Sequence, residues 1–133
     1  MQNGRNDVQL VAGADLSSSR NLLVKLDGTI PADATEVAVG SIATPGGNGD
    51  RISVAYQGIA TCVAGEALNA YGLVMAGTAA TAGQVLNAVT GAFGTNTILG
   101  QYIPELENGS INTNVAGEEV RVFLFADKTR LVP

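Results

Sequence analysis

The stretch Arg51–Val63, "RISVAYQGIATCV", decides the predicted fold, because its apolar residues repeat with a period of two. Every second residue from Ile52 to Tyr56 is apolar, which is the pattern of a half-buried β-strand. After Gly58 the alternation resumes in the opposite phase, beginning with Ile59. A glycine at such a phase switch predicts a β-bulge or a bend inside the strand.

The run "EEVRVFLF" (118–125) carries the same period of two near the C-terminus. Its two faces hold Val120, Val122 and Leu124 on one side and Arg121, Phe123 and Phe125 on the other. Because both faces contain apolar residues, the pattern favours a strand covered on both sides. Further strands are predicted at 7–12, 21–26, 36–42, 67–75, 84–89 and 97–103.

Turn signals separate these runs, at 26–29, 44–50, 90–96 and 107–110. Asp27-Gly28 and Asn108-Gly109 are strong hairpin dipeptides, since both tolerate positive φ. This spacing is typical of an all-β barrel or sandwich. We therefore predict a mainly β, single-domain protein with long Gly-rich loops. The domain spans 7–126, between a polar N-terminal arm at 1–6 and a C-terminal tail at 127–133.

One turn-like phrase recurs along the chain. The letters V-A-G-E occur at 63–66 and again at 115–118, and looser relatives begin at 11 and 81. We interpret the phrase as a turn that leads into a strand, with glycine supplying a backbone conformation that other residues avoid. The four glycines are irregularly spaced, which is not the fixed period of a solenoid.

Composition argues against several classes of function. The net charge is −5 and the seven basic residues are scattered singly, which disfavours binding to nucleic acid or to an anionic membrane. The N-terminus lacks the apolar segment of a signal peptide, so synthesis in a cytosol-like compartment is expected. The chain has no histidine and one cysteine, Cys62, which lies in an apolar run and is predicted to be a buried thiol. We expect no metal or other cofactor and no enzymatic activity.

The carboxylates are an alternative source of chemistry. Glu105 and Glu107 are placed to face the same way, whereas Glu118 and Glu119, if both lay on a strand, would point to opposite faces. Pro104 and Asn-Gly enclose the first pair, so a solvated loop is predicted there. The loop "TPGGNGD" (44–50) lacks the Lys and Ser/Thr of a phosphate loop and is predicted to be a hairpin connection.

The stretch 52–89 contains Gly58, then Ala64-Gly65, then "ALNAYGLV" at 67–74. In this order of motifs it resembles the capsid cement, or head decoration, proteins of tailed bacteriophages. The resemblance implies a β-rich virion protein that binds the outer surface of an assembled capsid and stabilises it. It implies the major capsid protein as partner, a homo-oligomer with a trimer favoured over a dimer, and a location on the capsid exterior after synthesis in the host cytoplasm. It carries over no catalytic residues.

Within the polar N-terminal arm, Gln2, Asn3, Gly4 and Arg5 are predicted to contact the capsid or a neighbouring subunit. Three alternatives remain open. One is a phage tail or head-fibre component, and another is a small β binding module. The third, a carboxylate-only hydrolase or lyase, requires a cavity that gathers Glu105, Glu107 or Asp50 with an arginine.

Overall fold

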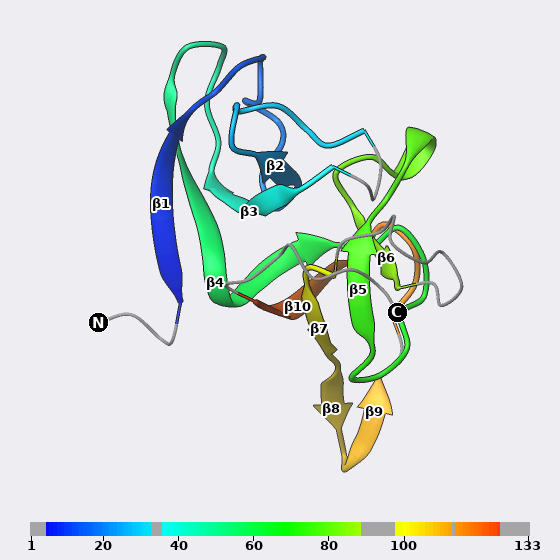
Figure 1. Cartoon of the computed structure of the whole chain (residues 1–133). Coiled ribbons are helices and arrows are strands. Elements are labelled where there is room, and N and C mark those ends of the chain that lie inside the picture. Colours follow the sequence, from blue (N-terminus) through cyan, green and yellow to red (C-terminus); the bar gives the residue numbers. More distant parts are fainter. Residues whose placement is uncertain (1–4, 33–35, 89–97, 113, 126–133) are drawn as a thin grey trace.

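The computed structural model describes residues 5–32, 36–88, 98–112 and 114–125 (Figure 1). Its strands are β1 (Asn6–Val11), β2 (Leu23–Lys25), β3 (Ala38–Thr44), β4 (Arg51–Val63), β5 (Leu73–Ala76), β6 (Val85–Asn87), β7 (Gly100–Ile103), β8 (Glu105–Glu107), β9 (Ser110–Asn112) and β10 (Glu119–Leu124). A single 3₁₀ turn, η1 (Ala79–Thr81), is the helical element of the described part. No helix there is long and apolar enough to cross a membrane.

Seven strands form one antiparallel sheet in the order β2-β3-β4-β10-β7-β5-β6. An eighth strand, β1, pairs with β4 outside this linear order. The sheet curls until its two ends nearly meet. The Leu23 N–H on β2 donates a hydrogen bond of 2.8 Å to the carbonyl oxygen of Gly83, just before β6. The predicted mainly β single domain is confirmed, and its architecture is that of a nearly closed barrel.

β4 is the strand that joins the two halves of this barrel. Its first half pairs with β1 and β3, and its second half, from Gly58 onward, pairs with β10. Gly58 adopts φ 91°, a conformation that L-residues avoid, and the strand bends sharply in Figure 1. The predicted bend is confirmed. The prediction that the apolar side after the bend begins with Ile59 is wrong, because Ala60 and Cys62 are buried there and Ile59 is 45% exposed.

The first half of β4 is buried on both faces. Val54 packs into a cluster with Leu16, Val24 and Ile42, while the next residue, Ala55, packs into the larger barrel core. The residues that cover the first cluster come from the loop between β1 and β2, including Ala12 and Leu16. A second layer of chain therefore lies over this part of the sheet.

β10 is covered on one face only. Val120, Val122 and Leu124 are buried, whereas Phe123 is 45% exposed. The prediction of a strand covered on both sides is therefore wrong. Phe123 instead contacts the ring of Phe125 edge-to-face, with 6.0 Å between the ring centroids.

Several predicted strands are shorter in the structure. The run 67–75 becomes β5 alone, because Asn69–Gly72 form a turn in which Tyr71 adopts φ 57°. Likewise Asn21, with φ 69°, lies outside β2. The predicted turn at 90–96 and the tail at 127–133 lie outside the described residues. Asn108 and Gly109 both have positive φ and join β8 to β9, as the dipeptide predicts.

The Ala-Gly phrases have two different roles. The phrases at Gly83 and Gly117 lead into strands β6 and β10, as predicted, and Gly117 adopts φ 90°. The phrases at Gly13 and Gly65 instead follow β1 and β4, so the prediction is wrong for them. A Cβ at Gly13 would lie 2.7 Å from the Asp27 carbonyl oxygen, so close packing requires that glycine.

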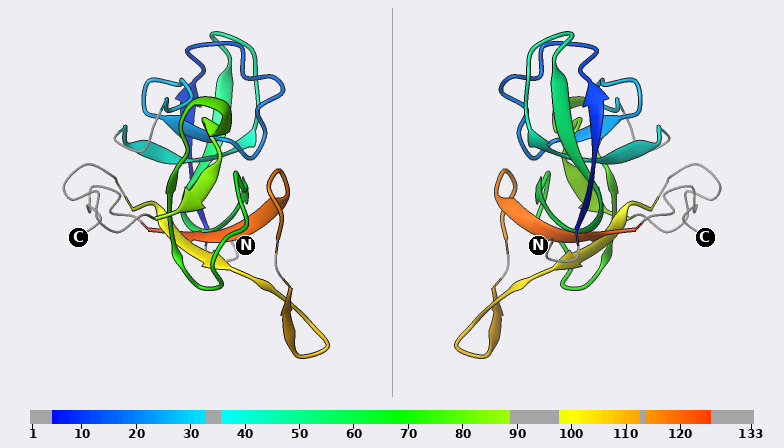
Figure 2. Two further views of the ribbon diagram at one scale, coloured as in Figure 1. Left: turned by 90° about the vertical axis from the view of Figure 1, so that its right-hand side faces the viewer. Right: turned by 90° about the vertical axis from the view of Figure 1, so that its left-hand side faces the viewer.

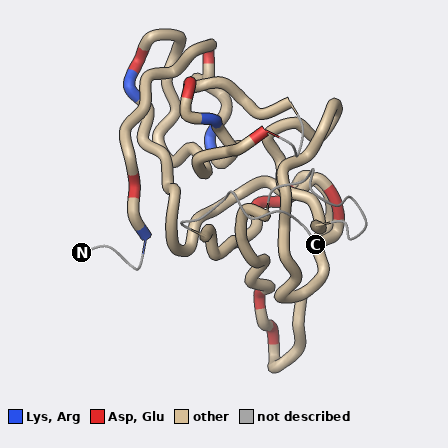
Figure 3. The backbone as a smooth tube through the Cα atoms, viewed as in Figure 1, with Lys and Arg blue, Asp and Glu red and all other residues tan. Residues whose placement is uncertain are grey.

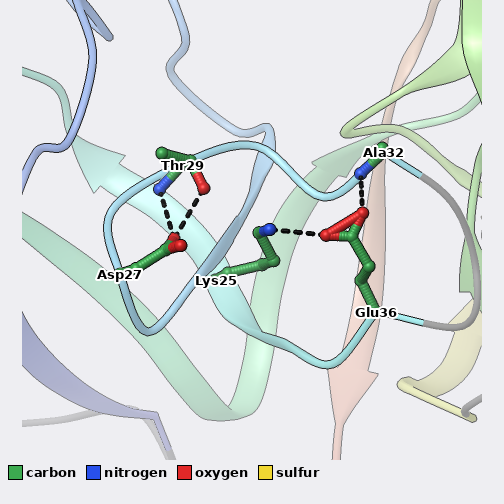
Figure 4. Close-up of polar contacts among 5 residues, drawn as sticks. All are labelled: Lys25, Asp27, Thr29, Ala32 and Glu36. Atoms are coloured by element: carbon green, nitrogen blue, oxygen red, sulfur yellow. Dashed lines mark hydrogen bonds and ion pairs between the residues drawn. The ribbon is translucent and has the colours of Figure 1, made fainter.

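Local polar contacts fix the segment that connects β2 to β3 (Figure 4). The Asp27 carboxylate accepts hydrogen bonds from the backbone N–H and the hydroxyl of Thr29, which lowers the pKa of Asp27. Lys25 forms an ion pair with Glu36, whose other carboxylate oxygen accepts the Ala32 N–H at 2.9 Å. These contacts hold the turn that follows β2.

The loop 44–50 connects β3 to β4, as predicted. Backbone hydrogen bonds of 2.8–2.9 Å join Ala12 to Asp50 and Gly49, and Leu16 to Gly46. The loop therefore packs on the segment after β1.

Candidate functional site

The β8–β9 hairpin extends away from the barrel (Figures 1 and 2). It forms its own two-stranded sheet, in which all six strand residues are exposed. Leu106 lies directly opposite Ile111, and these side chains are 64% and 47% exposed. An isolated two-stranded hairpin is at best marginally stable in water. The exposed apolar pair makes this projecting hairpin a candidate contact surface.

A second apolar surface lies on the outer face of the barrel. Phe123 on β10 pairs with Ile59 on β4 and with Gln101 on β7, and Gln101 pairs with Leu73 on β5. Residues directly opposite in antiparallel strands share a face of the sheet. Ile59, Phe123 and Leu73, which we call the outer row, are each 40–45% exposed.

The predicted arm contacts lie largely outside the described residues, since Gln2, Asn3 and Gly4 are not among them. Arg5 is described, and its guanidinium forms an ion pair with Asp7 at 2.9 Å. It lines an open cavity of about 450 Å³ together with Arg20 and Glu119, and the Asn21 amide donates to Glu119 at 2.8 Å. The structure thus places the end of the arm beside a polar cavity.

A third feature is an open cavity of about 330 Å³ near the base of the hairpin, which we call the acidic cavity. Its titratable lining residues are Tyr102, Glu105, Glu118, Glu119 and Arg121. Figure 3 shows how sparse charged residues are over the backbone and that the projecting hairpin carries acidic ones only. Burial, with Glu105 and Glu118 nearby, raises the pKa of the Tyr102 phenol, so this group is neutral at physiological pH.

The carboxylates are arranged differently from the sequence prediction. Glu105 and Glu107 lie on strand β8 and not in a loop, and Glu105 lines the acidic cavity while Glu107 accepts a hydrogen bond from Asn112. Glu118 precedes β10 in a turn, so strand alternation does not separate it from Glu119, and both line the cavity. The structure therefore brings Glu105 together with an arginine, Arg121, whereas Asp50 lies elsewhere.

Cys62 is buried in the barrel core, as predicted. Burial raises the pKa of its thiol to about 12, which leaves it protonated and unreactive at neutral pH. Within the described ranges, no three Cys, Asp or Glu side chains are grouped so that they would hold a metal ion.

The projecting hairpin is the feature that the strand predictions missed. Its segments are short and mostly polar, so apolar periodicity does not mark them. A signal was nevertheless present, because Leu106 and Ile111 are placed symmetrically about Asn108-Gly109, and a two-residue turn pairs them.

Comparison of the chain with models of protein families, with curated proteins and with solved structures found no match.

Proposed function

We propose that this protein is a structural virion component that binds the outer surface of an assembled phage capsid and stabilises it. The observation that carries the proposal is the projecting β8–β9 hairpin, whose Leu106–Ile111 pair is exposed in the isolated chain. We propose that this hairpin inserts between neighbouring subunits of the capsid. The sequence resemblance to capsid cement proteins supports the same conclusion.

Binding to the assembled shell stabilises it by mass action, provided that separated capsid subunits bind more weakly. Burying one exposed leucine contributes roughly 1.5–3 kcal/mol at most. A single hairpin therefore gives moderate affinity. Many equivalent sites on one shell make moderate affinity sufficient.

The outer row is the proposed contact between copies of this chain. It crosses four neighbouring strands and therefore spans roughly 14 Å. In a closed trimer each contact joins two different surfaces, and the same residues of the three copies come together only around the three-fold axis. We propose a homotrimer in which the outer rows of three copies are covered, while the hairpins remain free to reach the shell.

Co-sedimentation with expanded, undecorated capsids from the same source tests the proposal. Wild-type protein is expected to bind saturably, with a fixed number of copies per capsid. Leu106→Ser with Ile111→Ser removes the apolar pair and is expected to weaken binding at least tenfold, since two buried apolar contacts are lost.

The matched control is Leu26→Ser, which removes a side chain that is 73% exposed at the turn after β2. It is expected to bind like the wild type. Failure of the wild-type protein to bind intact shells would overturn the proposal and favour a tail or fibre component. Equal weakening by the control would show that the hairpin is not the contact.

A further inference from the structure

We infer that the acidic cavity binds the guanidinium or ammonium group of a basic side chain presented by a partner protein. The inference deepens the proposed function and rests on it for the identity of the partner. Its physical basis lies in three properties of the cavity, which are its charge, the hydrogen-bonding capacity of its carboxylates and the position of Tyr102.

The charge of the cavity favours a cation. Three carboxylates, on Glu105, Glu118 and Glu119, line it with a single cation, Arg121. Among the described residues the ion pairs are Arg5–Asp7 and Lys25–Glu36, so Arg121 neutralises none of these carboxylates by direct contact. An arriving positive charge is therefore attracted by an excess of negative charge.

The carboxylates also keep hydrogen-bonding capacity. Glu118 uses one oxygen to accept the Val115 N–H at 2.7 Å, and Glu119 uses one to accept the Asn21 amide. Because each carboxylate has two oxygens and about four lone-pair positions, acceptors remain on both. A guanidinium offers five donors in a planar fork that matches such acceptors.

Tyr102 gives a reason to expect a bound donor that does not depend on the charge of the cavity. The residue is only 4% exposed, yet its side chain lines the cavity. Its hydroxyl forms no hydrogen bond within the part of the chain that the structure describes, and the charges that act on it are those of Glu105, Glu118 and Arg121. Because no buried side-chain oxygen or nitrogen among the described residues lacks a hydrogen-bond partner, this unpartnered hydroxyl is accessible from the cavity, where it can pair with a bound donor.

Other ligand classes fit less well. An anion would meet three carboxylates. A sugar usually stacks on an exposed aromatic face, and the ring of Tyr102 is buried. The carboxylates do not form a group that would hold a metal ion.

The test uses the tripeptide acetyl-Gly-Arg-Gly-amide as the probe and acetyl-Gly-citrulline-Gly-amide as the matched neutral control. Binding is followed by NMR of the full-length ¹⁵N-labelled protein. The arginine peptide is expected to shift the amide signals of Ile103, Val120 and Arg121 saturably, and the citrulline peptide is not. A bound positive charge also lowers the pKa of Tyr102, which is measured from the ultraviolet absorbance of the phenolate.

Two variants define the site. Glu105→Gln is expected to weaken binding of the arginine peptide roughly tenfold, because a charge-assisted hydrogen bond is lost. Glu107→Gln makes the same change on the same strand outside the cavity, and its affinity is expected to stay within about twofold of wild type. Equal binding of the citrulline peptide, or equal loss in both variants, would overturn the inference.

The source of the basic side chain is distinguished with the same Glu105→Gln variant. Loss of capsid binding with an unchanged oligomer identifies the shell as the source, and dissociation of the oligomer identifies a second copy. If neither property changes, the inferred role with a protein partner is overturned. Failure of the arginine peptide to bind leaves the capsid test of the wild-type protein intact, so the two failures are distinguishable.

Discussion

Leu106 and Ile111 lie directly opposite each other on the β8–β9 hairpin, and both side chains face solvent. The pair therefore contributes little to the stability of the isolated chain. We expect Leu106→Ser to change the free energy of unfolding by less than about 0.5 kcal/mol, measured by urea denaturation. A loss above about 2 kcal/mol would show that Leu106 packs against its own domain.

The bend of β4 depends on Gly58. Because Gly58 adopts φ 91°, Gly58→Ala is expected to reduce stability by about 1–2 kcal/mol. Gly47→Ala is the matched control, since a Cβ at Gly47 meets only ordinary contacts, 3.4 Å or more away. Denaturant unfolding of both variants measures the difference. Equal stabilities would contradict the claim that the bend requires glycine.

Burial of Cys62 predicts a pH dependence. The thiol has a pKa of about 12 in the folded state and about 9 when unfolded. Its contribution to stability is therefore complete below pH 9 and declines between pH 9 and 12, because only the unfolded thiol ionises in that window.

Cys62→Ala removes this contribution, so the stability difference between wild type and Cys62→Ala is expected to shrink as the pH rises from 8 to 11. Urea unfolding at several pH values measures it. The native thiol is also expected to react with a thiol reagent only after unfolding. Rapid reaction of the folded protein at pH 8 would contradict the buried position.

Asn114 is a buried amide that joins two segments. Its oxygen accepts the Leu68 N–H at 2.9 Å, and its nitrogen donates to the carbonyl oxygens of Glu66 and Val115. Asn114→Ala leaves these groups without partners and is expected to cost about 2–3 kcal/mol of stability. Asn112→Ala, an exposed change two residues away, is expected to cost less than about 0.5 kcal/mol. Thermal or urea unfolding that ranks the two variants equally would refute this role.

The outer row predicts the oligomeric state. Wild-type protein is expected to sediment as a trimer in analytical ultracentrifugation. Phe123→Ser is expected to shift it toward monomer, because an aromatic side chain at the proposed interface is lost. Val115→Ser, which is 62% exposed but outside the row, serves as the control and should leave the trimer intact. An unchanged trimer for Phe123→Ser would exclude this face as the interface.

Local sequence patterns predicted those parts of the fold that depend on neighbouring residues. Alternation located β4 and β10, and positive-φ dipeptides located the turn at Asn108. The burial of Cys62 followed from its apolar surroundings. The prediction of which side is buried after Gly58 was wrong because the barrel interior takes the small side chains Ala60 and Cys62, while the larger Ile59 is 45% exposed.

The candidate site depends on contacts between distant segments, which no local pattern contains. The outer row exists only because the registers of four strands bring Ile59, Leu73 and Phe123 together. The acidic cavity likewise forms where the base of the hairpin lies beside the turn before β10. These two segments are separated along the chain. Spacing along the sequence places Glu105 with Glu107, whereas in the fold Glu105 lines the same cavity as Glu118.

The most direct measurement of the proposed function is the thermal melting of expanded, undecorated capsids with and without this protein. At saturating concentration the wild-type protein is expected to raise the capsid melting temperature, measured by scanning calorimetry. The double variant Leu106→Ser, Ile111→Ser is expected to raise it much less at the same concentration. A melting temperature that does not change when the wild-type protein is added would contradict the proposal that this protein stabilises an assembled shell.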